Sequence, residues 1–203
     1  NLRTTTDTEI ILKTFEELGT NAFRIFNGMF AFAIYNKTTK KIWLVRDRLG
    51  IKPLYYCFYN NAILFASEIK GILSLMHEKP ICNLSALSEF LYFGNTLGAR
   101  TLYKGIDQLL PGHYLEVDLK TFKYRINSFW SLAEQALKFN SSFHSIDEII
   151  VEIKRLLDAS VKRHLISDAP IGIFLSGGID SSTITAFASK HCNRVATYTA
   201  GFD

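Results

Sequence analysis

FLSGGIDSS, residues 174–182, is the stretch of the 203-residue sequence that decides the fold of its C-terminal part. An apolar run at residues 171–175 leads into it, and a helical pattern over about 181–192 follows. A second apolar run comes next, at residues 195–199. A strand, a helix and a strand in this order are typical of a parallel crossover unit. We therefore expect a βαβ unit, with the loop at the carboxyl end of its first strand, where open α/β sheets bind ligands.

The residue types of this loop favour binding of a phosphate group. The adjacent Gly177 and Gly178 allow backbone conformations that other residues avoid, and they let an anion approach closely. Amides of the first helical turn and nearby hydroxyls supply donors. The hydroxyl-bearing residues are Ser176, Ser181 and Ser182. Asp180 would repel phosphate unless Mg²⁺ bridges the two, so we expect it to be a metal ligand. An ordinary capped turn is the alternative, because Ser, Asp and Gly also favour caps, and the Walker spacing GxxxxGK[ST] is absent.

The first half of the chain has a different pattern, with four short apolar and aromatic runs separated by polar turns. The runs are MFAFAIY (29–35), KIWLVR (41–46), LYYCFY (54–59) and AILFAS (62–67). This pattern predicts an antiparallel meander with its aromatic side chains in the core. Further on, residues 113–118 and 123–130 predict a hairpin. We expect helices at residues 7–18, 68–76 and 84–93, the first with a capping box from Thr6 to Glu9 and a stop at Gly19.

Residues 131–145 form a polar connection, which we interpret as a linker between two domains. Beyond it, apolar residues recur at helical spacing from Ile146 to Leu165, after a capping box from Ser145 to Glu148. Pro170 ends this helical pattern. The change from strand periodicity to a long helix and a βαβ unit predicts an α+β domain followed by an α/β domain.

Composition and charge exclude several classes of protein. The chain is 48% hydrophobic and 21% charged, as in globular domains. Its net charge of +4 is spread without a long basic run, so we expect no nucleic-acid partner. No apolar stretch reaches the roughly 18 residues that span a bilayer, so we expect no membrane partner and a cytoplasmic location. Three cysteines, Cys57, Cys82 and Cys192, fit packing better than disulfides or a zinc site. Because Asn1 replaces an initiator Met and the sequence ends after a strand, we expect a fragment.

The loop SGGIDSS resembles the pyrophosphate loop of the ATP pyrophosphatases, which cleave ATP between the α and β phosphates to adenylate a substrate. Three segments of the first region closely resemble the glutaminase domain of glutamine-hydrolysing asparagine synthetases: GMFAFAIYN (28–36), RDRLGIKPLYY (46–56) and FASEIKGIL (65–73). TDTEIIL (6–12), LPGHYLEV (110–117) and DAPIGIFLSGG (168–178) follow the same family's order.

This resemblance implies a class II glutamine amidotransferase domain of the Ntn-hydrolase fold at residues 1–130, without its N-terminal part. Residues 131–145 would be the linker, and 146–203 the truncated start of an ATP-pyrophosphatase domain. The implied enzyme is an ATP-dependent carbon–nitrogen ligase. It adenylates aspartate with ATP and Mg²⁺ and amidates it with ammonia from glutamine, giving asparagine, glutamate, AMP and pyrophosphate. The alternatives are a related amidotransferase or β-lactam-synthetase-like enzyme acting on another carboxylate, and a non-catalytic relative used as a binding module. Family members are often dimers, so a homodimer is expected by analogy.

The resemblance also assigns individual residues. Asp7 matches the family aspartate that binds the α-amino group of glutamine. The positions that match the ATP site are Phe174, Leu175, Ser176, Gly177, Gly178, Asp180, Ser181, Ser182 and Ala200, with Asp180 also as the Mg²⁺ ligand. No catalytic residue is assigned, because the family nucleophile is a cysteine at the mature N-terminus and this chain begins with Asn1; we expect the chain alone to be inactive. Arg46 and Asp47 match the family's RD pair, for which we expect a structural ion pair.

Overall fold

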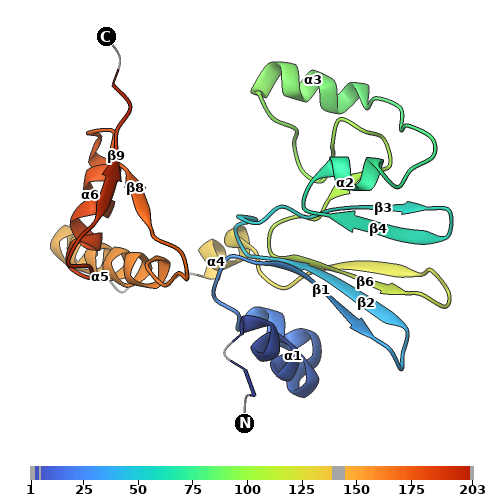
Figure 1. Cartoon of the computed structure of the whole chain (residues 1–203), viewed down its shortest axis with the longest axis horizontal. Helices are drawn as coiled ribbons and strands as arrows, with labels where there is room; N and C mark the ends of the chain where they lie inside the picture. The colour runs from blue at the N-terminus through green and yellow to red at the C-terminus, as the bar shows by residue number, and fades with distance from the viewer. Residues whose placement is uncertain (1–2, 5, 139–144, 202–203) are drawn as a thin grey trace. The chain divides into compact units, whose positions relative to one another are not determined.

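The structure is a computed structural model that describes residues 3–4, 6–138 and 145–201. The chain divides into two compact units, residues 1–139 and 140–203, which we describe separately (Figure 1). The first unit contains two antiparallel sheets with helices, and the second contains a parallel βαβ unit. The expected class, α+β followed by the start of an α/β fold, is confirmed.

Two sheets form the centre of the first unit. One has the order β1-β2-β6-β7 and the other the order β4-β3-β5. The strands are β1 (Ala31–Asn36), β2 (Lys41–Arg46), β3 (Tyr55–Tyr59), β4 (Ala62–Ala66), β5 (Asp107–Gln108), β6 (His113–Asp118) and β7 (Tyr124–Ser128). The predicted hairpin of β6 and β7 is present. The predicted meander is wrong, because β2 pairs with β6 rather than with β3, and the segment between β2 and β3 carries the chain from one sheet to the other.

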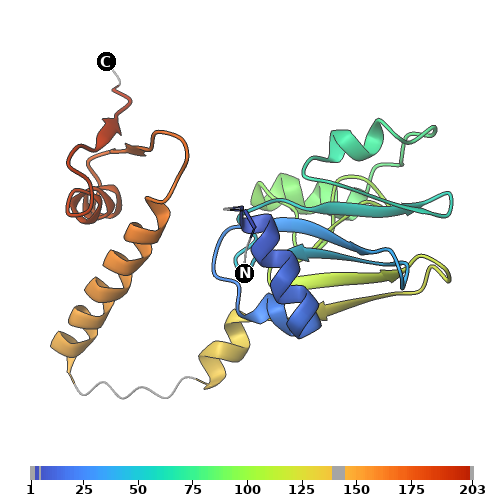
Figure 2. The ribbon, with the colours of Figure 1, turned by 60° about the horizontal axis from the view of Figure 1, so that its bottom comes forward.

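The sheets and helices of this unit are stacked in layers (Figures 1 and 2). Helix α1 (Asp7–Leu18) and the 3-10 helix η1 (Gly19–Arg24) cover the outer face of the β1-β2-β6-β7 sheet. Helices α2 (Ile69–Leu73) and α3 (Leu84–Phe93) lie on the side of the other sheet. Helix α3 has the predicted bounds, with Gly94 in the left-handed conformation after it, whereas α2 is shorter than the predicted 68–76 helix.

Alternation along the strands divides the core into layers. In β2, Ile42 and Leu44 face the second sheet, while Trp43 and Val45 face α1 and η1. Successive side chains of a strand point to opposite faces, so a strand buried on both sides must be apolar at every position. In β3, Tyr56 joins the core between the sheets. The next residue along β3, Cys57, belongs to a third core cluster, which also contains Ile72 of α2.

The expected aromatic core is confirmed. Phe30 and Phe32 pack against the cluster under α1, and Tyr55 packs against the cluster that contains Ile72. Phe15 of α1 lies in the same layer as Phe30 and Phe32, with its ring centroid 4.9 Å from that of Trp43. Aromatic side chains from the helix and from the sheet therefore form one continuous contact layer.

The N-terminus of α1 differs from the prediction. Thr6 is the N-cap residue, but its side chain makes no capping hydrogen bond. The carboxylate of Glu9 instead accepts hydrogen bonds from the amides of Arg3 and Thr4, at 2.8 and 2.6 Å, and from the Thr4 hydroxyl. Glu9 is thus used by the preceding chain, and the predicted capping box is wrong. The predicted stop is confirmed, because Gly19 has φ +58° and its amide donates to the carbonyl of Phe15.

Part of the segment predicted as a polar linker is helical. Helix α4 (Leu132–Lys138) lies inside residues 131–145. Its sequence, LAEQALK, consists of residues with high helix propensity, and the Ser131 hydroxyl accepts a hydrogen bond from the Glu134 amide. Residues 139–144 of the predicted linker lie outside the described residues.

The RD pair does not form the expected ion pair in the described part of the chain. The Arg46 guanidinium donates to the carbonyls of Gly50, Lys52 and Leu109. Burial lowers the pKa of Arg46, partly offset by nearby Asp47. The Asp47 carboxylate accepts hydrogen bonds from four main-chain amides, and these belong to Phe30, Leu49, Ile51 and Lys52. The prediction is wrong because both side chains bind backbone groups, which holds the chain where it passes between the sheets.

The second unit is built from helix α5 (Ile146–His164), strand β8 (Gly172–Phe174), helix α6 (Ile179–Ala188) and strand β9 (Ala196–Tyr198). The strands are parallel, as predicted, and pair in the register Gly172 to Ala196. Ser145 caps α5 by accepting a hydrogen bond from the Glu148 amide. Helices α5 and α6 contact each other. The Nε2 atom of His191, which follows α6, lies 3.0 Å from Oδ1 of Asp158 in α5.

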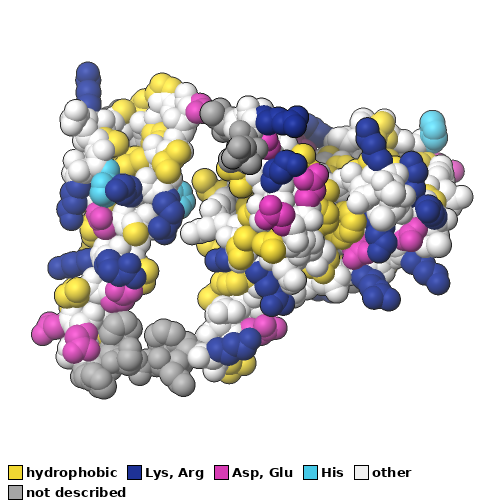
Figure 3. Space-filling view, turned by 90° about the horizontal axis from the view of Figure 1, so that it is seen from below, with side chains coloured by type: hydrophobic (Ala, Val, Ile, Leu, Met, Phe, Trp, Pro, Cys, Tyr) yellow, Lys and Arg dark blue, Asp and Glu magenta, His cyan; other side chains and the backbone are white. Residues whose placement is uncertain are grey.

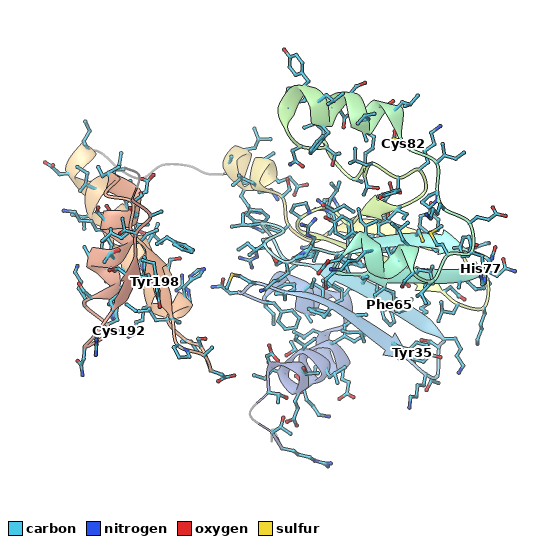
Figure 4. The ribbon with its side chains drawn as sticks, turned by 45° about the horizontal axis from the view of Figure 1, so that its top comes forward. Tyr35, Phe65, His77, Cys82, Cys192 and Tyr198 are labelled. Carbon is cyan, nitrogen blue, oxygen red and sulfur yellow. The ribbon has the colours of Figure 1, made fainter. Side chains whose placement is uncertain are left out.

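The cysteines have different surroundings. Cys57 is buried in the core, Cys192 is half-buried after α6, and Cys82 is exposed before α3 (Figure 4). The packing role predicted for Cys82 is therefore wrong, although its main chain forms a β-bridge with Tyr103.

In the described residues, no helix is both long and apolar enough to cross a membrane. Lysine and arginine side chains are interspersed with acidic ones on the face shown in Figure 3.

Candidate nucleotide-binding site

The loop between β8 and α6 has a backbone that glycine makes possible. Gly177 has φ +79°, a conformation that residues with a Cβ rarely adopt. Gly178 is the N-cap residue of α6, and the Ser182 amide donates to its carbonyl at 3.0 Å. No heavy atom would lie within 4 Å of a Cβ at Gly177. The loop is therefore open at this point, and only the backbone angle restricts the residue there.

Two serines hold the ends of the loop together. The Ser181 hydroxyl lies 3.2 Å from that of Ser176 and accepts a hydrogen bond from the Ser176 amide at 3.3 Å. It also lies 3.2 Å from the carbonyl of Gly178. Ser176 and Ser182 are exposed. The predicted residues 174–182 thus span the end of β8, the loop and the first turn of α6, and Ser181 joins the loop to the helix.

The neighbouring strand brings the last predicted residue to the same edge. The Leu175 amide donates to the carbonyl of Tyr198 at 2.8 Å, and the Thr199 hydroxyl donates to the carbonyl of Leu175 at 2.6 Å. Ala200 follows directly and is exposed. Figure 4 shows Tyr198 on β9 beside β8. Thr199 was missed by sequence reasoning, and a threonine at the end of the second strand is the signal that could have identified it.

Asp180 lies in the first turn of α6 and is exposed. Within the described residues, neither a hydrogen bond nor a salt bridge engages its carboxylate, and there is no group of three or more His, Cys, Asp or Glu side chains that could hold a metal alone. Mg²⁺ commonly takes one or two carboxylates together with phosphate oxygens and water. A single carboxylate beside this glycine loop therefore fits a metal that arrives with phosphate oxygens as its other ligands.

Asp7, the residue predicted to bind glutamine, is the first residue of α1 and is exposed. The helix is held by Ile11 and Phe15, which pack against the core under it. Asp7 belongs to the first unit and the loop at 174–182 to the second, and each predicted site lies within its own unit.

Comparison with known proteins identifies both parts of the chain. The family model described as "Glutamine amidotransferase domain" matches residues 1–130, and the one described as "Asparagine synthase" matches residues 152–203. A solved structure of glutamine phosphoribosylpyrophosphate amidotransferase from B. subtilis aligns with 98% of this chain and 40% of its own. Its TM-score is 0.42 at 16% identity.

Curated relatives extend the match across the chain. Asparagine synthetase [glutamine-hydrolyzing] 2 of Bacillus subtilis is 39% identical over 93% of the chain, and asparagine synthetase [glutamine-hydrolyzing] 3 of the same organism is 35% identical over 92%. Amidase chry2 of Gibberella zeae is 32% identical over 90%. The chain spans only 26%, 30% and 26% of the lengths of these relatives. With one match in each unit, the chain belongs to the family of glutamine-hydrolysing asparagine synthetases.

Proposed function

We propose that the protein carrying this chain makes asparagine from aspartate, ATP and glutamine. Aspartate would attack the α-phosphate of ATP through its side-chain carboxylate, giving an acyl-adenylate and pyrophosphate. Ammonia, released from glutamine by water with formation of glutamate, would then displace AMP from the acyl carbon. The turn at residues 176–182, at the carboxyl end of β8, is the observation that carries the proposal.

The residues of the turn have distinct tasks in this proposal. The hydroxyls of Ser176, Ser181 and Ser182 and the first amides of α6 would donate to the phosphate oxygens, stabilising charge that develops on pyrophosphate as it leaves. Asp180 would hold Mg²⁺, which neutralises phosphate charge when bound. Backbone groups of Phe174, Leu175 and Ala200 would hold the nucleoside.

Asp7 would bind the α-amino group of glutamine. A carboxylate suits an ammonium group, and Asp7 is exposed at the start of a helix that is packed against the core. We place the protein in the cytoplasm and expect a homodimer by analogy with its family.

Pyrophosphate release, measured with the longer protein that carries this chain, tests the role of the loop. With saturating aspartate, ATP and Mg²⁺, Gly177→Ala should reduce the rate of release by about tenfold or more, because a residue with a Cβ at φ +79° strains the backbone by about 1–2 kcal/mol and displaces the donors. Gly105→Ala is the matched control, since Gly105 has φ +80°, equal open space and no place in the loop. Equal rates in the two variants would refute the assignment of the loop.

Asp180→Ala separates the two half-reactions. It should abolish pyrophosphate release and leave glutamine hydrolysis measurable, because Asp180 and Asp7 lie in different units. Asp7→Asn should raise the KM for glutamine, while ammonia-supported pyrophosphate release continues. Full pyrophosphate release by the Asp180 variant would contradict its role as a metal ligand.

A second candidate function is amidation of another carboxylate. The similarity to amidase chry2, at 32% identity over 90% of the chain, supports this candidate. A relative that aligns with both units of this chain is named an amidase and not an asparagine synthetase. An acceptor screen that measures pyrophosphate release distinguishes the two. Release with aspartate alone supports asparagine synthesis, and release with another carboxylate but not with aspartate supports the second candidate.

A further inference from the structure

A pocket in the first unit lies away from both predicted sites. Its cavity volume is about 350 Å³, and it lies where η1, the chain after β2, the end of β7 and α4 meet. Helix α4, yellow in Figure 2, contributes Glu134, Gln135 and Lys138 to its lining. Every residue that lines it belongs to the first unit, so the pocket is complete without the second.

Positive charge predominates in this pocket. Arg24, Arg48 and Lys138 line it, and Glu134 supplies the one carboxylate among its described lining residues. In the described part of the chain, no salt bridge within 4.0 Å neutralises any of these four side chains. Gln135 and Ser128 add neutral polar groups. Side chains with free N–H donors thus converge on a concave space.

The Arg48 guanidinium is held by a main-chain contact. Arg24 is the last residue of η1, and Arg48 donates from Nη2 to the Arg24 carbonyl at 2.7 Å. The Nε of Arg48 is buried and has no hydrogen-bond partner within the described residues. Arg48 is therefore fixed at the wall of the pocket, where it and Arg24 can present the remaining N–H groups of their guanidinium groups to a ligand.

We propose that this pocket binds the phosphate group of a small anion. Each guanidinium group presents several N–H donors in one plane, and this arrangement matches the oxygens of a phosphate group. Lys138 adds a point charge from α4, and the pocket is larger than a single phosphate ion. The phosphate could be free or carried as a monoester on a small molecule.

Tryptophan fluorescence provides the test on the full 203-residue chain. Trp130 lines the pocket, and the other tryptophan, Trp43, is buried under α1. Titration with inorganic phosphate at constant ionic strength should change the fluorescence and saturate, with a midpoint of about 1 mM. A parallel titration with glycerol phosphate separates the two sources. A lower midpoint for glycerol phosphate than for inorganic phosphate indicates that the pocket binds a phosphate monoester. Equal midpoints indicate that it binds free phosphate.

Variants identify the donors. Arg24→Gln and Lys138→Gln should each raise the midpoint about tenfold, and both residues are exposed, so the fold should persist in circular dichroism. Arg125→Gln is the matched control, because Arg125 is an exposed basic residue of β7 that does not line this pocket. A response that does not saturate, or a midpoint that Arg24→Gln leaves unchanged, overturns the proposal.

Discussion

At the scale of single residues, Asp47 is the strongest example of a buried charge held by backbone groups. Its side chain is 1% exposed and accepts from four amides, so Asp47→Asn replaces two acceptor oxygens by one and turns a donor toward donors. We expect the free energy of unfolding to fall by about 3 kcal/mol in urea titrations. Asp118→Asn is the control, because the Asp118 carboxylate accepts its hydrogen bonds from the amides of Lys120 and Thr121 in an exposed turn. A smaller loss for Asp47→Asn than for Asp118→Asn would contradict this.

Tyr56 makes stability depend on pH in the alkaline range. Burial, with a smaller contribution from Asp107, raises its pKa from 10.0 to about 12. Below pH 10 the Tyr56 side chain is neutral in both the folded and the unfolded chain. Between pH 10 and 12 it ionises in the unfolded chain first, so its contribution of about 2–3 kcal/mol to stability is lost as the pH rises.

Tyr56→Phe tests this linkage, because it keeps the ring and removes the titrating group. Urea unfolding at pH 9 and at pH 11.5 should show a smaller loss of stability for the variant than for the parent chain. Other tyrosines and lysines titrate equally in both proteins. If the two proteins lose the same stability between these pH values, the Tyr56 assignment is wrong.

Residue roles were predictable where they are local. The caps at Ser145, Gly19 and Gly94 depend on neighbours within a few positions, and all three are present. The role of Asp47 was not predictable, because one of its partners, Phe30, lies in another segment. Glu9 is a local exception, because its carboxylate accepts hydrogen bonds from the amides of Arg3 and Thr4 and does not form the predicted capping box.

At the scale of elements, α1 is the element that links the expected glutamine site to the core. Phe15→Ala removes contacts with Phe23 and Trp43, whose ring centroids lie 5.6 and 4.9 Å away. We expect a loss of about 2 kcal/mol in the free energy of unfolding and faster hydrogen exchange along α1. Leu12→Ala on the exposed side of the helix should change stability by less than about 0.5 kcal/mol. Equal effects would mean that α1 is not held through Phe15.

Most strands and helices were predictable from periodicity, but their assignment to sheets was not. Hairpin β1–β2 and hairpin β3–β4 each form between neighbours in sequence, as expected. The pairing of β2 with β6 joins segments about 70 residues apart, and nothing in either strand alone specifies it. The candidate nucleotide loop was found because strand, loop and helix are contiguous there, whereas the pocket beside α4 is assembled from three separate stretches of chain, at Arg24, at Arg48 and at residues 128–138.

At the scale of the whole molecule, the two units differ in how much core they possess. The three buried hydrophobic clusters all lie in residues 1–139. In the second unit, Ala188 is the one buried hydrophobic residue among those described. Along α5, apolar side chains predicted as a helical stripe remain exposed, including Ile146 at 75% and Ile153 at 50%. Hydrophobic burial is the main source of folding free energy, so the second unit has much less of it per residue.

We therefore expect the second unit to open at much lower free energy than the first. In hydrogen exchange followed by mass spectrometry at pH 7, peptides covering α5 and α6 should exchange long before those covering β2 and β6, whose central residues are fully buried. Asp47→Asn should accelerate exchange in the first unit and leave the second unchanged, because separate cores contribute independently. Equal protection of α5 and β2 would show that the helix is stabilised by contacts other than its own unit's core.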